Sequence, residues 1–202
     1  MLDLIKQVQA IAQAGLHYGE NDYDLDRYQR LNELTQQMFN AWTGTAPEFA
    51  ARWYEGEIGY PTPKVDVRAV VMRDGKMLLV REKIDGCWSL PGGWADVGCT
   101  VRETAEKETW EEAGLRVKAQ RLLAVFDKKC HPHPPEPWYV YKHFVLCDIA
   151  TGEGDGQAGM ETLDVGFFGP NELPPLSVDR NTASQVHQMF TLATSVQPTI
   201  FD

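Results

Sequence analysis

Three glutamates in this chain are spaced so that they share one face of a helix. Glu108, Glu111 and Glu112 lie three and four residues apart within residues 93–115, GWADVGCTVRETAEKETWEEAGL, and side chains at that spacing are neighbours on a helix surface. Carboxylates placed in this way repel one another by roughly 0.2–0.5 kcal/mol per pair. A cation offsets the repulsion, and Mg²⁺ prefers oxygen ligands while keeping waters and substrate phosphates. The pattern therefore indicates a metal platform for phosphate chemistry.

Glycines on both sides distinguish this segment from an ordinary solvated acidic helix, which would carry the same glutamates. The run WSLPGG at residues 88–93 leads in, Gly98 follows a short loop, and Gly114 occupies the position of a helix C-cap. Glycine lets the backbone turn sharply and approach a ligand closely. The sequence therefore predicts a helix whose acidic face is held beside a tight, glycine-rich loop.

In these residues the chain resembles the Nudix hydrolase family, whose signature reads G-x5-E-x7-R-E-U-x-E-E-x-G-U, with U an apolar residue. The positions that match in register are Gly93, Glu108, Glu111, Glu112, Gly114 and Leu115. A match spread over a window of 23 residues is far more specific than a lone glycine motif.

The sequence departs from the family pattern at three positions. Cys99 stands where the family has its first glutamate, Lys107 replaces the arginine, and Thr109 replaces an apolar residue. Lys107 keeps the positive charge without the planar fork of arginine, and it can pair with Glu103 or Glu111 four residues away. Asp96 is a candidate to cover part of the missing carboxylate's role. The resemblance implies that this glutamate lies outside the innermost metal shell, so we expect weakened rather than abolished activity.

Length, charge and cysteine usage restrict the class of protein. A chain of 202 residues is long enough for one good core and a small extra domain. A net charge of −10 argues against general affinity for nucleic-acid backbones. We expect no membrane span and no secretion signal. The scattered cysteines without a CxxC pair agree with a reducing, cytoplasmic location.

Residues 1–60 read as a helical extension. Apolar residues recur at helical spacing from Leu2 to Ala12, and Gly15 predicts a stop. A second helix is expected from Asp24 to Trp42, and a third, short helix over 47–54. Helices this few and short bury little surface alone, so we expect the extension to pack on a partner or to form a dimer.

Residues 64–202 read as a separate domain with strands. The segment 65–72 alternates and is rich in β-branched residues, and Asp74-Gly75 predicts a hairpin turn before a returning strand at 77–81. Further segments complete an α+β pattern: strands at 117–127, 139–149 and 164–168, and a helix at 182–194. The resemblance implies an α/β/α sandwich with a mixed sheet over about residues 64–195.

The order of segments also resembles a subgroup of the family, the ADP-ribose or CDP-choline pyrophosphatases, in which an N-terminal helical extension takes part in a homodimer. The resemblance implies hydrolysis of a nucleoside diphosphate linked to another moiety, giving a nucleoside monophosphate and a phosphorylated product. It implies Mg²⁺ or Mn²⁺ as the cofactor and a small-molecule nucleotide as the substrate.

The mechanism that the resemblance implies gives roles to the carboxylates. Glu108 and Glu112 are expected to be the main metal ligands because they lie one helical turn apart, and Glu111 is expected to be either a ligand or the residue that orients the catalytic water. The backbone carbonyl of Gly93, or of Gly92 before it, completes the coordination shell.

The family often takes a further carboxylate from a loop after the signature as ligand or general base. Glu161, after the glycine-rich stretch 152–159, is the first candidate, and an ordinary solvated loop residue is the alternative. Asp164 is the second candidate.

Substrate contacts are expected from cations and aromatic rings, although surface charge and core packing explain such residues equally well. The candidates for phosphate binding are Arg81, Lys83, Lys128, Lys129 and Lys142. The candidates for stacking on a base are Trp88, Trp94, Phe126 and Tyr141. Trp88 is expected to be partly core.

Three other interpretations remain open. The Cys130-His131-Pro132-His133 run could bind zinc, although it lacks paired ligand spacing, and a solvated loop near the substrate is the alternative. The domain could be a nucleotide-binding regulatory module that has lost catalysis, as the substitution at Cys99 suggests. The same metal site could also act on RNA ends, which the acidic balance disfavours.

Overall fold

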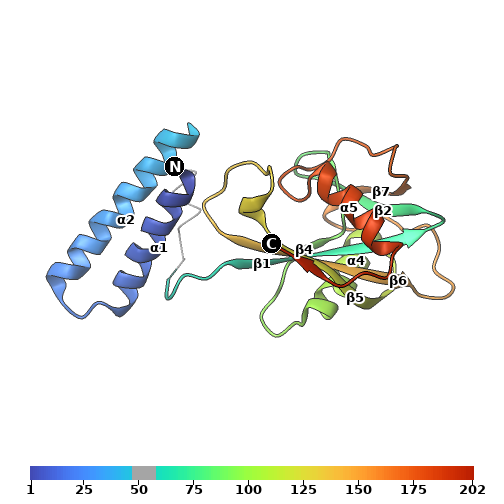
Figure 1. Ribbon diagram of the computed structural model, residues 1–202, viewed down its shortest axis with the longest axis horizontal. Helices are drawn as coiled ribbons and strands as arrows, with labels where there is room; N and C mark the ends of the chain where they lie inside the picture. Colours follow the sequence, from blue (N-terminus) through green and yellow to red (C-terminus); the bar gives the residue numbers. More distant parts are fainter. Residues whose placement is uncertain (47–57) are drawn as a thin grey trace. The chain divides into compact units, whose positions relative to one another are not determined.

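The computed structural model describes residues 1–46 and 58–202, which form two compact units (Figure 1). One unit comprises the described residues 1–46 and 58–63 with 135–139, and the other comprises 64–134 with 140–202. The sequence placed the segment 135–139 in the second domain, whereas it belongs to the helical unit. The short helix expected over 47–54 lies outside the described residues.

The helical unit is a hairpin of α1 (Leu2–Tyr18) and α2 (Asp22–Thr43). Ile5 on α1 and Phe39 on α2 form its small apolar core. The predicted stop at Gly15 is wrong, because α1 continues to Tyr18. A Cβ on Gly15 would lie 2.4 Å from the ring of Tyr28, so the glycine serves the close packing of α2 on α1.

The start predicted for the second helix was also late. α2 begins at Asp22, because Asn21 rather than Asp24 is its N-cap and accepts a hydrogen bond from the Tyr23 N–H at 2.9 Å. The helix ends at Gly44, which adopts a left-handed conformation (φ 70°). Sequence periodicity detects both helices but locates their ends less well, because the caps depend on single residues.

The segment 135–139 is bound to α1 through polar contacts. The Lys6 ammonium donates a hydrogen bond to the carbonyl of Trp138 and lies 4.8 Å from the centroid of the Tyr139 ring. The Tyr139 hydroxyl donates to the Asp3 carboxylate at 3.1 Å. Residues 138 and 139 are thus held by the first helix of their own unit.

The second unit is built on one mixed sheet. Its elements in chain order are β1 (Lys64–Arg73), β2 (Lys76–Glu82), β3 (Trp88–Ser89), β4 (Gly92–Trp94), α4 (Val101–Ala113), β5 (Val117–Asp127), the 3₁₀ turn η1 (Lys128–Cys130), β6 (Val140–Ile149), β7 (Thr162–Phe168), α5 (Ala183–Ala193) and β8 (Ile200–Phe201). The strand order is β3-β2-β1-β6-β5-β8, with β4 also paired to β1 and β7 to β2. β1 runs parallel to β6 and β5 parallel to β8, and the other pairs are antiparallel.

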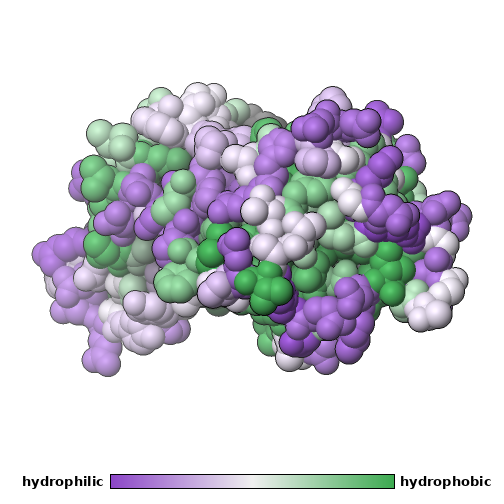
Figure 2. Space-filling view, turned by 45° about the vertical axis from the view of Figure 1, so that its right-hand side comes forward, coloured by the Kyte–Doolittle hydropathy of each residue, from purple (hydrophilic) through white to green (hydrophobic). Residues whose placement is uncertain are grey.

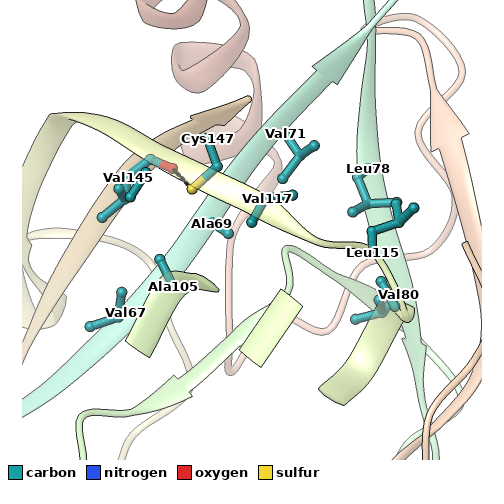
Figure 3. Packing of buried hydrophobic residues seen from close by; sticks show 12 residues of the cluster. Val67, Ala69, Val71, Leu78, Val80, Ala105, Leu115, Val117, Val145 and Cys147 are labelled. Carbon is teal, nitrogen blue, oxygen red and sulfur yellow. Dashed lines mark hydrogen bonds between the residues drawn. The ribbon is translucent and has the colours of Figure 1, made fainter. Parts of the chain in front are cut away.

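The sheet lies between α4 and α5. Along β1, alternate side chains join different cores: Val67 and Ala69 belong to a cluster with Ala105 of α4, whereas Val70 belongs to a cluster with Val186 of α5. Figure 3 shows the first cluster, in which side chains of several strands meet α4. This confirms the α/β/α sandwich with a mixed sheet.

The hairpin predicted at Asp74-Gly75 is confirmed, since both residues adopt positive φ (50° and 74°) between β1 and β2. The sequence did not predict β3, β4 and β8, because strands of two or three residues are too short to show alternation. None of the described helices combines the length and apolar character needed to cross a membrane.

Candidate active site

The helix α4 that carries the glutamates is terminated firmly at both ends. At its start Thr100 and Glu103 form a reciprocal capping box, in which the Glu103 carboxylate accepts from the Thr100 N–H at 2.8 Å. At its end Gly114 adopts a left-handed conformation (φ 63°) and its N–H donates to the Trp110 carbonyl at 2.9 Å. These caps fix the position of the acidic face along the helix.

The three carboxylates on this helix lie in different environments. Glu112 is buried, and its Oε2 accepts a hydrogen bond from the Gly92 N–H at 2.9 Å. The Glu108 side chain is 15 % exposed and that of Glu111 is 52 % exposed. A Cβ on Gly93 would lie 3.1 Å from Glu108 Oε2, so the glycine lets the carboxylate approach strand β4.

Burial governs the protonation of this acidic face. Desolvation raises the pKa of Glu112 to about 7 even though Arg68 and the Gly92 N–H favour the ionised form. Desolvation also raises the pKa of Glu108, against the attraction of Lys107. A cation at this face would offset the same penalty, since a bound ion reverses the local preference for the neutral acid.

Lys107 lies among the acidic side chains. Its ammonium is 2.8 Å from Asp96, 3.4 Å from Glu108 and 3.6 Å from Glu111, and the hydrogen bond to Asp96 is the main reason its pKa is raised. The expected pairing with Glu111 is confirmed, whereas Glu103 is engaged in the helix cap. Asp96 is paired with Lys107. Its expected role, to cover part of the function of the glutamate that Cys99 replaces, stays a prediction.

Among residues 1–46 and 58–202 no group of three or more His, Cys, Asp or Glu is gathered into a ready-made metal cage. Mg²⁺ does not need such a cage, because it is usually bound by one or two carboxylates together with waters and substrate phosphates. In the suggested zinc segment the two histidines have other partners. His131 Nε2 lies 3.0 Å from Asp202, and His133 Nδ1 lies 2.6 Å from the Val178 carbonyl.

The loop before β7 is attached to the last turn of α4. The Gly159 N–H and the Thr162 hydroxyl both donate to the carbonyl of Glu112, at 3.2 Å and 2.7 Å. Glu161 lies between these two anchors with an exposed side chain, and its carbonyl accepts from the Lys83 N–H at 3.2 Å. The fold thus brings Glu161 to the helix end that carries Glu112. Its role as base stays a prediction.

Asp164, the second candidate for the base, lies in β7 opposite Arg81 of β2. Its carboxylate accepts a hydrogen bond from the N–H of the next residue, Val165, at 2.9 Å. This contact is local to β7, whereas the anchors that flank Glu161 bind the Glu112 carbonyl of α4 directly.

A buried group of charges beside the glycine loop was not predicted. Asp66, Arg68 and Lys142 are 3 %, 5 % and 2 % exposed, and the Asp66 carboxylate binds both the guanidinium of Arg68 and the ammonium of Lys142. The available signal was the presence of two charged residues at alternate positions, Asp66 and Arg68, within the otherwise apolar segment 65–72.

Neighbouring contacts extend this buried polar region. Glu82 at the end of β2 accepts from the Ser89 hydroxyl at 2.5 Å and lies 2.8 Å from Arg180. Its charge also raises the pKa of Glu112, as a lesser contribution than burial. The buried polar region therefore includes one further anionic side chain, Glu82, and its cationic partner, Arg180, which sequence periodicity did not reveal.

The cations predicted to contact substrate occupy diverse positions. Lys142 is buried on Asp66, and Lys128 is buried in η1. Arg81 donates to the Gly86 carbonyl at 2.9 Å, and Lys83 donates to the Met160 carbonyl. Lys129 is partly exposed and lies 3.4 Å from the Asp127 carboxylate.

The predicted aromatic contacts divide into buried and exposed rings. Phe126 is 3 % exposed and packs within the α5-side core, and Trp88 packs edge-on against Phe168 at 4.7 Å, as a partly core residue. Trp94 and Tyr141 are 49 % and 42 % exposed and are therefore available for stacking. Their roles in substrate binding stay predictions.

Comparison with known proteins is consistent with this geometry. A family model described as the NUDIX domain matches residues 62–189, and a second, described as a UDP-X-like, N-terminal oligomerisation domain, matches residues 1–54. A Bacillus subtilis (strain 168) protein named "Putative ADP-ribose pyrophosphatase YjhB" is 43 % identical over 202 residues, covering 100 % of this chain and 96 % of that protein.

Two solved structures are also similar. The crystal structure of an ADP-ribose pyrophosphatase from Streptococcus suis 89-1591 is 43 % identical with a TM-score of 0.62, over 70 % of this chain and 100 % of that chain. The crystal structure of a UDP-X diphosphatase is 31 % identical with a TM-score of 0.65, over 100 % of this chain and 97 % of that chain.

The pKa of Glu112 predicts a pH dependence for the metal-free protein. Folding raises this pKa from its ordinary value of 4.5 to about 7, so the folded protein holds the proton more tightly than the unfolded chain. The free energy of unfolding therefore falls as the pH rises through this interval. Glu112→Gln keeps an oxygen for the Gly92 N–H and has no charge to bury. We expect the variant to be more stable than wild type at about pH 8 by roughly 1–3 kcal/mol.

Urea unfolding in the presence of a chelator, repeated across the pH range, measures this difference. The gap between wild type and Glu112→Gln should close near pH 4, where both side chains are neutral in either state. Equal stability of the two proteins at about pH 8 would show that the ionised carboxylate is buried without a penalty.

The close packing of Gly159 gives a second prediction, which concerns enzymatic turnover rather than the free energy of unfolding. A Cβ at this position would lie 1.7 Å from the carbonyl oxygen of Glu111, so Gly159→Ala must displace the loop or the last turn of α4. We expect turnover to fall at least about tenfold, because a displacement near 1 Å is costly at a catalytic site. Gly154→Ala is a matched control, since a Cβ there meets nothing within 4 Å. Equal activity of the two variants would contradict a role for this anchor.

Proposed function

This chain belongs to the Nudix hydrolase family, and we propose that, as a Nudix pyrophosphohydrolase, it converts ADP-ribose and water to AMP and ribose 5-phosphate. The observation that carries the proposal is the placement of Glu108 and Glu112 on one face of a doubly capped helix, with Glu112 bonded to the glycine loop. The full-length similarity to a protein named as an ADP-ribose pyrophosphatase supports the substrate. Family membership favours an enzyme over a regulatory module.

We assign a divalent metal, Mg²⁺ or Mn²⁺, to the carboxylates of Glu108 and Glu112. Glu111 is the third ligand or orients the water, and the backbone carbonyl of Gly92 or Gly93 completes the donor set. These donors fit a hard cation because all of them are oxygens, and because two of the carboxylates are buried enough to have raised pKa values. When bound, the metal neutralises charge on the diphosphate oxygens and lowers the pKa of a bound water.

The side chains then perform the proton transfer. The oxygen of a water molecule forms a bond to one phosphorus of the diphosphate, and the proton of that water passes to a carboxylate. The bond from the same phosphorus to the bridging oxygen breaks, and this oxygen leaves with the bonding electrons as part of the second phosphate product. Glu161 is the first candidate for this base because its two anchors bind the Glu112 carbonyl. We place Glu111 of α4 ahead of Asp164, the second candidate from the sequence, because the Asp164 carboxylate is hydrogen-bonded within β7.

Substrate binding is assigned to the predicted cations and aromatic rings around this face. The proposed phosphate contacts are Arg81, Lys83, Lys128 and Lys142, and the proposed base contacts are Trp88, Phe126 and Tyr141. Tyr141 is the best placed of the rings, because its side chain is exposed whereas Phe126 lies in the core.

A UDP-linked compound is the second candidate substrate. The N-terminal family model is described as UDP-X-like, and the UDP-X diphosphatase structure is similar over the whole of this chain. Both candidates are nucleoside diphosphates linked to another moiety, so the same metal site and the same bond cleavage serve either one.

Turnover of a substrate panel with Mg²⁺ or Mn²⁺ tests the proposal. The panel contains ADP-ribose, UDP-sugars, CDP-choline, nucleoside triphosphates and a labelled RNA. We expect ADP-ribose to give the highest kcat/KM, and Glu112→Gln to abolish its cleavage. Loss of the base should lower kcat by roughly 10²–10⁴-fold, so Glu161→Gln and Glu111→Gln identify which residue acts.

Glu106→Gln is the matched control on the same helix. Its carboxylate accepts from the Ala119 N–H at 2.9 Å and lies 3.2 Å from Lys118, and we expect wild-type turnover. Preference for a UDP-sugar would support the second candidate, and cleavage of RNA alone would reject both. Failure to cleave any panel member by a folded protein would contradict the assigned activity.

We also propose that the helical unit forms a homodimer through its exposed apolar side chains. Leu4 and Ile11 lie two turns apart on α1 and are 58 % and 60 % exposed, and Leu34, Met38 and Trp42 recur every four residues on α2. Figure 2 shows that apolar side chains, in green, reach the surface among polar ones. An exposed apolar stripe of this kind is typical of a protein interface, and the family description of residues 1–54 supports self-association.

Light scattering coupled to gel filtration tests this assignment. We expect the wild type to be a dimer and Ile11→Asp or Met38→Asp to shift it to a monomer, because a charge in an apolar interface must be desolvated. Ile84→Asp is the control, since Ile84 is 80 % exposed in the other unit and lies outside the proposed interface. An unchanged mass for both helix variants would contradict the proposal.

A further inference from the structure

A short strap at the start of β4, residues 90–92, presents the glycine loop to the glutamates. Its backbone groups are clamped on several sides. The Leu90 N–H donates to Asn181 Oδ1 at 2.8 Å, and the Leu90 carbonyl accepts from Arg68 Nη1 at 3.1 Å. The Pro91 carbonyl accepts from the Ala69 N–H at 2.8 Å. The Gly92 N–H then donates to the Glu112 carboxylate, so the clamp ends on a proposed metal ligand.

The strap lies so close to β1 that Arg68 of this strand is its direct neighbour. A Cβ on Gly92 would lie 1.9 Å from the Val67 carbonyl oxygen, and the backbone there adopts a φ of 147°, which favours glycine. The strand register pairs Gly92 with Arg68. The guanidinium consequently reaches the strap backbone, and its charge acts on the nearby carboxylates of Glu112 and Glu82.

Arg68 is itself held in one orientation by buried partners. Its Nε lies 3.1 Å from Asp66 Oδ2 and its Nη2 lies 2.7 Å from Asp66 Oδ1, a two-pronged contact that only a planar fork can make. The Asp66 carboxylate also binds a second cation, the ammonium of Lys142 from the neighbouring strand β6. The remaining guanidinium nitrogen, Nη1, is thereby directed to the Leu90 carbonyl.

Stability does not account for this arrangement. All three side chains are almost fully buried, and buried ion clusters are often no more stabilising than well-packed apolar residues of the same volume. What the cluster does supply is a fixed donor at the strap and a positive charge behind the acidic face. The cost of desolvating three ions is therefore better explained by what they hold in place than by the free energy of unfolding.

We propose that Arg68, aligned by Asp66 and Lys142, is a positioning residue that assembles the strap and the Glu112 carboxylate before a divalent metal binds. The inference rests on the proposed metal site, and it extends that site to Asp66 and Arg68 on β1, which are not among the proposed metal ligands or substrate contacts. Such supporting side chains around metal ligands typically change metal affinity by roughly 10–100-fold when they are removed.

The first test uses the metal-free wild-type protein. If the strap is assembled in advance, hydrogen exchange followed by NMR will show slow exchange of the Leu90 and Gly92 amides in the presence of a chelator. Fast exchange of both amides without metal, with protection only after Mg²⁺ is added, would overturn the proposal. This result requires no variant, so it decides the question even where a substitution prevents folding.

The second test compares Arg68→Lys with Arg73→Lys. Both residues are arginines of β1, and Arg73, at the far end, is paired with Asp155 at 2.8 Å. Lysine at position 68 keeps the charge but cannot contact Asp66 twice and Leu90 at once. We expect Arg68→Lys to weaken Mn²⁺ binding, measured by electron paramagnetic resonance, by roughly 10–100-fold, and to speed exchange of the Leu90 amide. Arg73→Lys should change neither.

Wild-type Mn²⁺ affinity in a folded Arg68→Lys protein would overturn the inference. A general loss of stability would instead speed exchange across the core strands in the same variant. Because both readouts are taken without substrate, they are separate from the activity proposal. A protein that cleaves no panel compound, yet shows the Arg68 effect on Mn²⁺, retains the inference and loses the assigned reaction.

Discussion

The hydrogen bond from the Gly92 N–H to the Glu112 carboxylate joins the two parts of the site, helix α4 and strand β4. It forms only because β4 approaches β1 within a distance that leaves no room for a Cβ at Gly92. Once it forms, one carboxylate of the acidic face is buried and loses water. Nearby groups must then compensate for the cost of that desolvation, and the charged side chains beside Glu112 are arranged accordingly.

That compensation is incomplete, and the remainder is consistent with a metal site. Arg68 and the Gly92 N–H favour the ionised form of Glu112, but burial and the neighbouring Glu82 raise its pKa to about 7. Lys107 partly balances Glu108 and Glu111 from the outer side. An acidic face whose negative charge is only partly neutralised by neighbouring cations is suited to bind a metal ion. A face whose carboxylates were all paired would gain little from binding one.

The capped ends of α4 and the anchored loop before β7 add geometric precision. Thr100 and Gly114 set where the helix begins and ends, so the glutamates cannot slide relative to the strap. Gly159 and Thr162 bind the carbonyl of Glu112 and carry Glu161 to the same helix end. Residues 112 and 162, some fifty positions apart in the chain, therefore meet through a hydrogen bond from the Thr162 hydroxyl to the Glu112 carbonyl, and functional residues are often carried on loops that a rigid scaffold positions in this way.

The sequence by itself determined the acidic helix with its C-cap and the hairpin at Asp74-Gly75, because each depends on local spacing and turn chemistry. The spacing of the glutamates and glycines also carried the resemblance to the family, and that resemblance implied the mixed sandwich. It misplaced the end of α1, because Gly15 makes room for Tyr28, a contact invisible along the chain. The tertiary structure alone decided which carboxylate is buried and that Asp66, Arg68 and Lys142 meet behind it. Burial and charge pairing arise between strands and helices remote in sequence, so no local pattern encodes them.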